Sequence, residues 1–274
     1  MYSSEQQAVE RKPVTVTRLR KMKQDGEKIV MLTAYDASFA ALLDASGVDV
    51  ILVGDSLGMV MQGQEATIPV TMDDMIYHTR CVASRRGCSF LVADMPFLSY
   101  TDPATALVNA GRLMKEGGAQ MVKLEGGFAQ VAVVEALTSQ GVPVCGHLGL
   151  LPQSVHKLGG YKVQGREQAE AERLVEEATA LQEAGADILV LECIPANLAR
   201  RVMDTLDIPV VGIGAGVDCD GQVLVLQDML GITPGKRPSF SHNFMEGSAS
   251  VAGAVGDYVK SVKSGAFPTA EHSF

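Results

Sequence analysis

The chain has 274 residues, of which 47% are apolar and 20% are charged, a balance typical of a globular protein rather than a disordered or membrane-spanning one. The 32 Asp and Glu residues outnumber the 23 Lys and Arg residues and give a formal net charge of −9, so we expect no nucleic-acid partner. No apolar stretch approaches the length of a membrane span, and the first dozen residues are too polar for a targeting sequence. The five cysteines form no Cys-x-x-Cys pair, which indicates reduced thiols in a cytoplasmic protein without membrane contact.

The N-terminal 14 residues are polar, and we predict that residues 1–14 form a flexible tail. Thr15 is suited to cap a short helix over residues 16–25, which precedes the first strand and is placed to close the floor of a barrel. Because the chain shows no linker and no shift in composition, residues 1–274 are predicted to form one domain.

Seven short runs rich in Val, Ile and Leu alternate with longer amphipathic segments, which is the order of a β/α protein. Since the runs are apolar nearly throughout, they resemble parallel strands that helices cover on both faces. The runs span residues 29–35, 48–54, 90–95, 120–124, 142–146, 187–191 and 208–213. Helices are predicted over residues 37–46, 71–86, 103–117, 128–140, 167–185, 196–206 and 219–230.

After Gly231 the chain becomes rich in proline and glycine, and an eighth strand is predicted at residues 238–241, with a last helix over residues 245–264. Seven or eight parallel strands in a chain of this length fit a (β/α)₈ TIM barrel. An open, doubly wound sheet is the alternative.

The apolar runs end in polar side chains. In chain order these are Asp36, Asp55 with Ser56, Asp94, Lys123 with Glu125, His147 and Glu192. The C-terminal ends of all strands in a barrel meet on one face, where such enzymes build their active sites. Several carboxylates buried together need cations, because an unpaired buried charge is costly.

Lys123 supplies one of these cations and lies beside Glu125, since residues two apart on a strand point to the same face. A divalent cation would supply the remaining charge. Carboxylate oxygens from Asp55, Asp94 and Glu125 favour Mg²⁺ over Zn²⁺, and no His or Cys group has the spacing of a zinc site.

Several of these residues also have simpler interpretations. Asp36 is equally suited to cap the helix that follows it, and His147 is equally compatible with a hydrogen-bonded histidine of the core. Lys123 and Glu125 also fit an exposed salt bridge. Glu192 ends the most apolar strand, where loss of water would strengthen a carboxylate as a general base.

Two loops on the expected active-site face, at residues 57–70 and 151–166, are too long to be simple connections. They are suited either to cover a substrate or to contact another subunit.

Eight segments, in this order along the chain, resemble the ketopantoate hydroxymethyltransferase family. They are TAYD at 33–36, VGDSLG at 53–58, ADMPF at 93–97, VKLEGG at 122–127, CGHLGL at 145–150, GGYKVQGR at 159–166, LEC at 191–193 and GIGAG at 212–216. The similarity runs from about residue 14 to the C-terminus.

This resemblance implies a (β/α)₈ barrel that transfers a hydroxymethyl group from 5,10-methylenetetrahydrofolate to 3-methyl-2-oxobutanoate. The product is 2-dehydropantoate, on the route to pantothenate and coenzyme A. The resemblance also implies a homo-oligomer, a decamer by the family's pattern.

The resemblance further assigns roles to residues. It implies that Asp55, Asp94 and Glu125 hold Mg²⁺, which stabilises the enolate of the substrate, and that Asp55, Ser56, Asp94 and Lys123 bind the substrate. Glu192 is implied as the proton acceptor, and His147, Asp36 and Tyr35 as supporting residues around the site.

Two other functions remain open from the sequence. One is a lyase or mutase on a related 2-oxo acid, as in the phosphoenolpyruvate mutase and isocitrate lyase group. The other is a non-catalytic barrel that serves as a scaffold.

Overall fold

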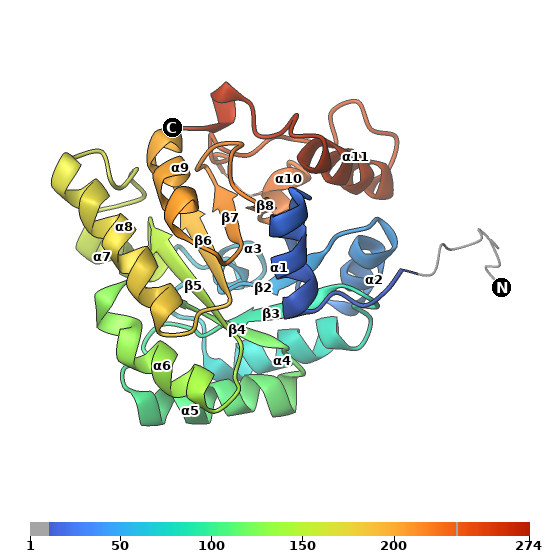
Figure 1. Cartoon of the computed structure of the whole chain (residues 1–274). Helices are drawn as coiled ribbons and strands as arrows, with labels where there is room; N and C mark the ends of the chain where they lie inside the picture. Colours follow the sequence, from blue (N-terminus) through green and yellow to red (C-terminus); the bar gives the residue numbers. More distant parts are fainter. Residues whose placement is uncertain (1–10, 234) are drawn as a thin grey trace.

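The protein is a closed barrel of eight parallel strands in sequence order, seen in a computed structural model that describes residues 11–233 and 235–274 (Figure 1). The strands are β1 (Ile29–Thr33), β2 (Val50–Val53), β3 (Phe90–Asp94), β4 (Met121–Glu125), β5 (Val144–Gly149), β6 (Ile188–Glu192), β7 (Val210–Ile213) and β8 (Gly221–Leu224). Pairing of β8 with β1, which sets Ile29 opposite Gly221, closes the sheet and leaves it without an edge. The predicted TIM barrel is confirmed, and the open sheet is excluded.

Helices surround the barrel and cover the outer faces of its strands (Figure 1). The longer ones are α1 (Val16–Asp25), α2 (Ala37–Ala45), α4 (Met72–Ala83), α5 (Pro103–Arg112), α6 (Val131–Ser139), α8 (Gln168–Glu183), α9 (Ala196–Thr205) and α11 (Val251–Lys263). Three single turns, α3 (Leu57–Val60), α7 (Val155–Leu158) and α10 (Leu226–Met229), lie in segments that follow β2, β5 and β8. No helix within the described residues is both long and apolar enough to cross a membrane.

Helix α1 lies across the N-terminal ends of the strands, so the prediction that it closes the barrel floor is confirmed. The Thr15 hydroxyl caps it by accepting from the Arg18 amide. Lys23 lies 3.1 Å from Asp220, directly before β8, and Arg20 lies 2.6 Å from Asp187, directly before β6. The apolar side of α1, with Leu19 and Met22, is fully buried.

The tail prediction differs from the structure at residues 11–14, while residues 1–10 lie outside the described part of the chain. The Arg11 guanidinium donates to the Val48 carbonyl at 2.6 Å and lies 3.2 Å from the Asp49 carboxylate. Val14 is buried, and its amide donates to the Cys88 carbonyl. These contacts attach residues 11–14 to the barrel.

The eighth strand was placed wrongly at residues 238–241, and the helix predicted over residues 219–230 is also wrong. The eighth strand is β8, and only the single turn α10 follows it. Strands β8 and β1 approach closely at Gly221, where a Cβ atom would lie 2.4 Å from the Ile29 carbonyl oxygen. The pairing of these two strands therefore requires glycine at this position. The last helix, α11, is shorter than the predicted 245–264, because it begins after the cap residue Ser250.

Replacement of Leu19 tests whether the floor helix stabilises the barrel. Leu19→Ala leaves a cavity beneath the strands and is expected to lower the free energy of unfolding by about 2–5 kcal/mol in urea denaturation. Lys21→Ala, on the exposed side of the same helix, should change it by less than about 0.5 kcal/mol. Equal effects of the two substitutions would contradict this role of α1.

Candidate active site

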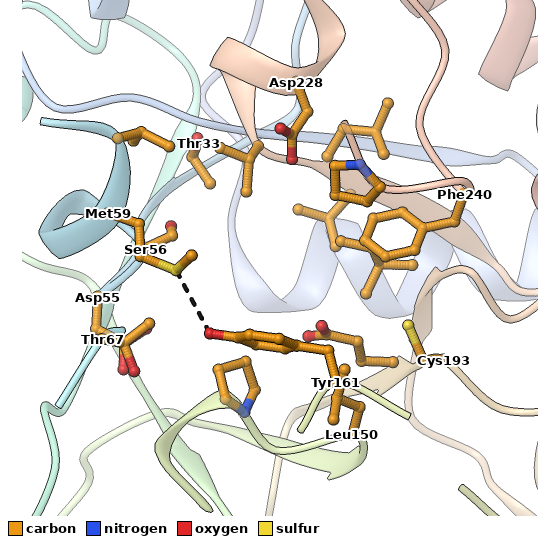
Figure 2. Close-up of a pocket in the computed structure, with 18 of the residues that line it drawn as sticks. Thr33, Asp55, Ser56, Met59, Thr67, Leu150, Tyr161, Cys193, Asp228 and Phe240 are labelled. Atoms are coloured by element: carbon orange, nitrogen blue, oxygen red, sulfur yellow. Dashed lines mark hydrogen bonds between the residues drawn. The ribbon is translucent and has the colours of Figure 1, made fainter. Parts of the chain in front are cut away.

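A cavity of ≈ 730 Å³ opens at the C-terminal ends of the strands (Figure 2). It is lined by seven of the residues that the sequence singled out, namely Asp55, Ser56, Asp94, Lys123, Glu125, His147 and Glu192. Each of them lies within three residues of the C-terminal end of a strand, so the closure of the barrel brings together side chains from β2 to β6.

Asp94 links two other members of this group. Its Oδ1 accepts from Lys123 Nζ at 2.7 Å, and its Oδ2 accepts from the Asp55 backbone amide at 3.0 Å. Burial lowers the pKa of Lys123, but the carboxylates of Asp94, Glu125 and Asp55 outweigh burial and raise that pKa overall. Lys123 is therefore a permanent cation, and its buried pairing excludes the exposed salt bridge considered from the sequence.

Asp55 carries the least favourable charge of the cavity. Burial, followed by repulsion from Asp94 and Glu125, raises its pKa well above the ordinary value. Lys123 and a hydrogen bond from Gln153 Nε2 to Asp55 Oδ2, 2.8 Å long, offset only part of this effect.

Gln153 and Tyr100 complete the site but were missed by the sequence analysis. The Gln153 backbone amide donates to Glu125 Oε2 at 3.1 Å, and its side chain donates to Asp55 and to the Met95 carbonyl. Its amide oxygen accepts from the Tyr100 hydroxyl, which in turn accepts from the Glu125 amide. The only signal was the unusual length of the loop at 151–166, which contains Gln153.

His147 lies between two carboxylates. Its Nδ1 is 3.4 Å from Glu125 Oε1 and its Nε2 is 3.2 Å from Glu192 Oε2, although neither contact has the geometry of a hydrogen bond. Burial and Lys123 lower the pKa of His147, but the two glutamates outweigh them and raise it to about 9. The imidazolium at neutral pH therefore places a positive charge beside the Glu192 carboxylate at the cavity wall.

Tyr35 and Asp36, also named from the sequence, lie outside the cavity lining. The Tyr35 hydroxyl and the Ser56 hydroxyl are hydrogen-bonded at 2.8 Å, so Tyr35 fixes the position of Ser56. Asp36 instead caps α2, where its Oδ1 accepts from the amides of Ser38 and Phe39. The capping interpretation of Asp36 is confirmed, and its place around the site stays a prediction.

The donor set of the cavity fits a hard divalent cation. In the part of the cavity at the ends of β2 to β6, two cations, Lys123 and His147, face the four carboxylates of Asp55, Asp94, Glu125 and Glu192, so full ionisation of these carboxylates leaves an excess of negative charge there. Within the described part of the chain, no three His, Cys, Asp or Glu side chains converge closely enough to surround an ion by themselves. This agrees with Mg²⁺, which commonly binds through one or two carboxylates and retains water.

Barrel and cavity together define a (β/α)₈-barrel enzyme whose active site is a buried group of carboxylates around a lysine. The model of the family described as ketopantoate hydroxymethyltransferase matches residues 13–270, and the chain belongs to this family. It is 62% identical to the 3-methyl-2-oxobutanoate hydroxymethyltransferase of Nitrosococcus oceani, over 95% of this chain and 99% of the relative. It is 61% identical to the protein of the same name from Alkalilimnicola ehrlichii, over 96% and 95% of the two chains.

Solved structures with the same fold are more distant in sequence. Phosphonopyruvate hydrolase superposes with a TM-score of 0.60 at 14% identity, over 80% of this chain and 83% of that one. The structure of 2,3-dimethylmalate lyase superposes with a TM-score of 0.53 at 20% identity, over 72% of this chain and 70% of that one. That protein is described as a member of the phosphoenolpyruvate mutase/isocitrate lyase superfamily. These likenesses show the fold alone, so they do not favour a lyase or mutase over the family to which the chain belongs.

Asp55→Asn tests the electrostatic cost of the cavity. A carboxyl whose pKa is raised by folding stabilises the protein only while it is protonated, so its contribution is lost as pH rises from about 4 through its folded-state pKa. In EDTA, Asp55→Asn is therefore expected to gain stability relative to the wild type between pH 4 and pH 8, measured by urea denaturation.

The matched control is Asp257→Asn at an exposed position of α11. It should change the free energy of unfolding by less than about 0.5 kcal/mol at both pH values. A relative loss of stability for Asp55→Asn at pH 8 would show that Asp55 is well compensated, contrary to the repulsion inferred here.

Proposed function

We propose that the protein transfers a hydroxymethyl group from 5,10-methylenetetrahydrofolate to 3-methyl-2-oxobutanoate, giving 2-dehydropantoate for pantothenate and coenzyme A synthesis. The observation that carries the proposal is a carboxylate of Glu192 at the wall of a cavity whose opposite side holds Lys123, Asp55 and Asp94. That arrangement suits removal of a proton beside a carbonyl group, and it occurs in a chain of the ketopantoate hydroxymethyltransferase family.

The substrate is a small anion with a carboxylate and an adjacent keto oxygen. Lys123 supplies a buried positive charge for these oxygens, and the Ser56 hydroxyl, held by Tyr35, supplies a hydrogen-bond donor. When ionised, Asp55 and Asp94 can only accept hydrogen bonds, so they need a cation between themselves and the anionic substrate.

Mg²⁺ is the cation that the donor set favours. Asp55 and Asp94, which are linked through the Asp55 amide, would hold it directly, and Glu125 would reach it through water because Gln153 and His147 already contact both of its oxygens. When bound, the metal polarises the keto group and stabilises negative charge on its oxygen.

Glu192 is placed to accept the proton from C3 of the substrate. A C–H bond beside a ketone is a weak acid, so the reaction needs both a positioned base and a site that stabilises the resulting negative charge. The positively charged ring of His147 lies 3.2 Å from the Glu192 carboxylate. The C–C bond that then forms joins C3 to the methylene carbon of the donor, whose two C–N bonds break. One water supplies the hydroxyl oxygen of the product, and tetrahydrofolate leaves with the proton from C3 and one proton of the water on its two nitrogens.

The surroundings of the cavity support this chemistry by limiting access of water. Tyr161, from the loop at 151–166, lies at the cavity, and its hydroxyl is 3.6 Å from the Met59 sulfur of α3 (Figure 2). The two long loops predicted to cover the site therefore meet there. A homo-oligomer, decameric by family resemblance, and a cytoplasmic location stay predictions, as does the single domain over residues 1–274.

Formation of 2-dehydropantoate from 3-methyl-2-oxobutanoate tests the proposed function directly. Product is expected only when methylenetetrahydrofolate and Mg²⁺ are both present, and chelation with EDTA should abolish it. Equal product without the folate donor, or with the metal removed, would contradict the proposal.

Glu192→Gln separates proton transfer from binding. Glutamine keeps the shape of the side chain but cannot accept the proton, so turnover should fall by about 10²- to 10⁴-fold. Calorimetric binding of 3-methyl-2-oxobutanoate in the presence of Mg²⁺ should change by less than about threefold. Wild-type turnover in this variant would remove Glu192 from the role of base.

Asp94→Asn tests the metal assignment. Loss of one anionic oxygen is expected to weaken Mg²⁺ binding at least about tenfold, or about 1.4 kcal/mol, in titration calorimetry. Asp257→Asn, outside the cavity, should bind Mg²⁺ like the wild type. Unchanged affinity in Asp94→Asn would show that Asp94 does not hold the metal.

A further inference from the structure

The active-site cavity is larger than a five-carbon acid requires, and its composition changes from one part to another. Carboxylates and Lys123 occupy the part at the ends of β2 to β6. Another part of the wall is made by the segment after β8, including Asp228 of α10, Thr233 and residues 236–240, together with the C-terminal Phe274. None of the residues assigned to proton transfer or metal binding lies in this second part.

Asp228 is the most informative residue of that wall. It belongs to α10 and is only 5% exposed, yet it lines the cavity, and Figure 2 shows its carboxylate directed into the open space opposite the Tyr161 ring. Its Oδ1 accepts from the Thr233 hydroxyl. No hydrogen bond to its Oδ2 is formed by residues 11–233 and 235–274. This oxygen faces the open cavity and is free to accept hydrogen bonds from a ligand.

Aromatic rings stand beside this carboxylate. Phe240 and Phe274 pack on the backbone of Gly214, where an added Cβ atom would lie 3.0 Å from Phe240 and 3.1 Å from Phe274. The Phe274 carbonyl accepts from the Ala196 amide, which fixes the end of the chain at the cavity. The wall around Asp228 is thus apolar and aromatic, and suits a flat heterocycle.

Cations collect where this part of the cavity meets the solvent. Lys236 and Arg237 follow α10, and Lys162 lies on the facing loop; all three are exposed and line the cavity. The charge of Arg237 also lowers the pKa of Asp228, against the larger effect of burial. In a chain with a net charge of −9, three cations at one opening form a local binding site for anionic groups.

We propose that this second part of the cavity is the subsite for the folate donor, with Asp228 bound to the pterin ring. The proposal rests on the proposed function, which requires such a donor. The 2-amino and N3–H groups of a pterin are two adjacent donors that match the two oxygens of one carboxylate. Phe240 and Tyr161 contact the faces of the ring system, and Lys236 and Arg237 meet the glutamate carboxylates of the tail.

This placement also suits the reaction. Asp228, Tyr161 and the proposed base Glu192 line the same cavity. A donor held between Asp228 and Tyr161 therefore presents its one-carbon unit to the substrate carbon from which Glu192 removes the proton.

Two ligands test the binding of the pterin ring and of the glutamate tail separately. Tetrahydrofolate carries both parts, whereas 6-methyltetrahydropterin carries only the ring, and neither supplies a one-carbon unit. Calorimetric binding of each is measured with the wild type, with Asp228→Asn and with the double variant Lys236→Ala/Arg237→Ala. Asp257→Asn and Lys260→Ala, at exposed positions of α11, are the matched controls.

Asp228→Asn is expected to weaken both probes at least about tenfold, because an amide replaces one acceptor with a donor. The double variant should weaken tetrahydrofolate by a similar factor, reduce the salt dependence of its binding, and leave 6-methyltetrahydropterin within about twofold of the wild type. Solvent exchange of the C3 hydrogen of 3-methyl-2-oxobutanoate, which needs no folate, should persist in Asp228→Asn and shows that the variant is folded.

Wild-type affinity of Asp228→Asn for both probes, in a protein whose turnover requires the folate donor, would overturn this subsite and leave the proposed function standing. Failure of the wild type to bind tetrahydrofolate, together with turnover that does not need the donor, would overturn both.

Discussion

The site depends on one electrostatic constraint, an excess of buried negative charge at the C-terminal end of the barrel. Lys123 and His147 do not balance four carboxylates, and Asp55 shows the consequence in its raised pKa. Such a cavity is unfavourable when it holds only water and protein, but it is well prepared for a divalent cation and an anionic ligand. The carboxylates that favour ligand binding are therefore the same groups whose mutual repulsion destabilises the unliganded protein.

The barrel stabilises this arrangement by linking its charged groups to one another and to the ends of the strands. The floor helix α1 and the closure of β8 on β1 hold the strands, so the side chains at their opposite ends converge without much freedom. Gln153 then connects Asp55 to Glu125, while His147 connects Glu125 to Glu192. A shift of any one member would therefore disturb its neighbours, which favours a single, preorganised geometry.

Much of this was predictable from the sequence, because parallel strands buried on both faces leave a simple signature. Each carboxylate that ends an apolar run lies in the cavity except Asp36, whose local bonds to the helix that it caps could not be distinguished from a site role. The strand β8 was missed because four residues carry too little pattern and their pairing with β1 is nonlocal. Gln153 and Asp228 were missed because they gain their roles only when distant loops fold over the strand ends.

The central claim is that the cavity removes the C3 proton of a 2-oxo acid with Glu192 as base. The most direct measurement is the exchange of that hydrogen with deuterated solvent, monitored by NMR. The wild-type protein is incubated with 3-methyl-2-oxobutanoate and Mg²⁺ but without folate. The account predicts exchange well above the uncatalysed rate, and loss of exchange on chelation of the metal. Absence of exchange under conditions in which the substrate is bound would contradict it.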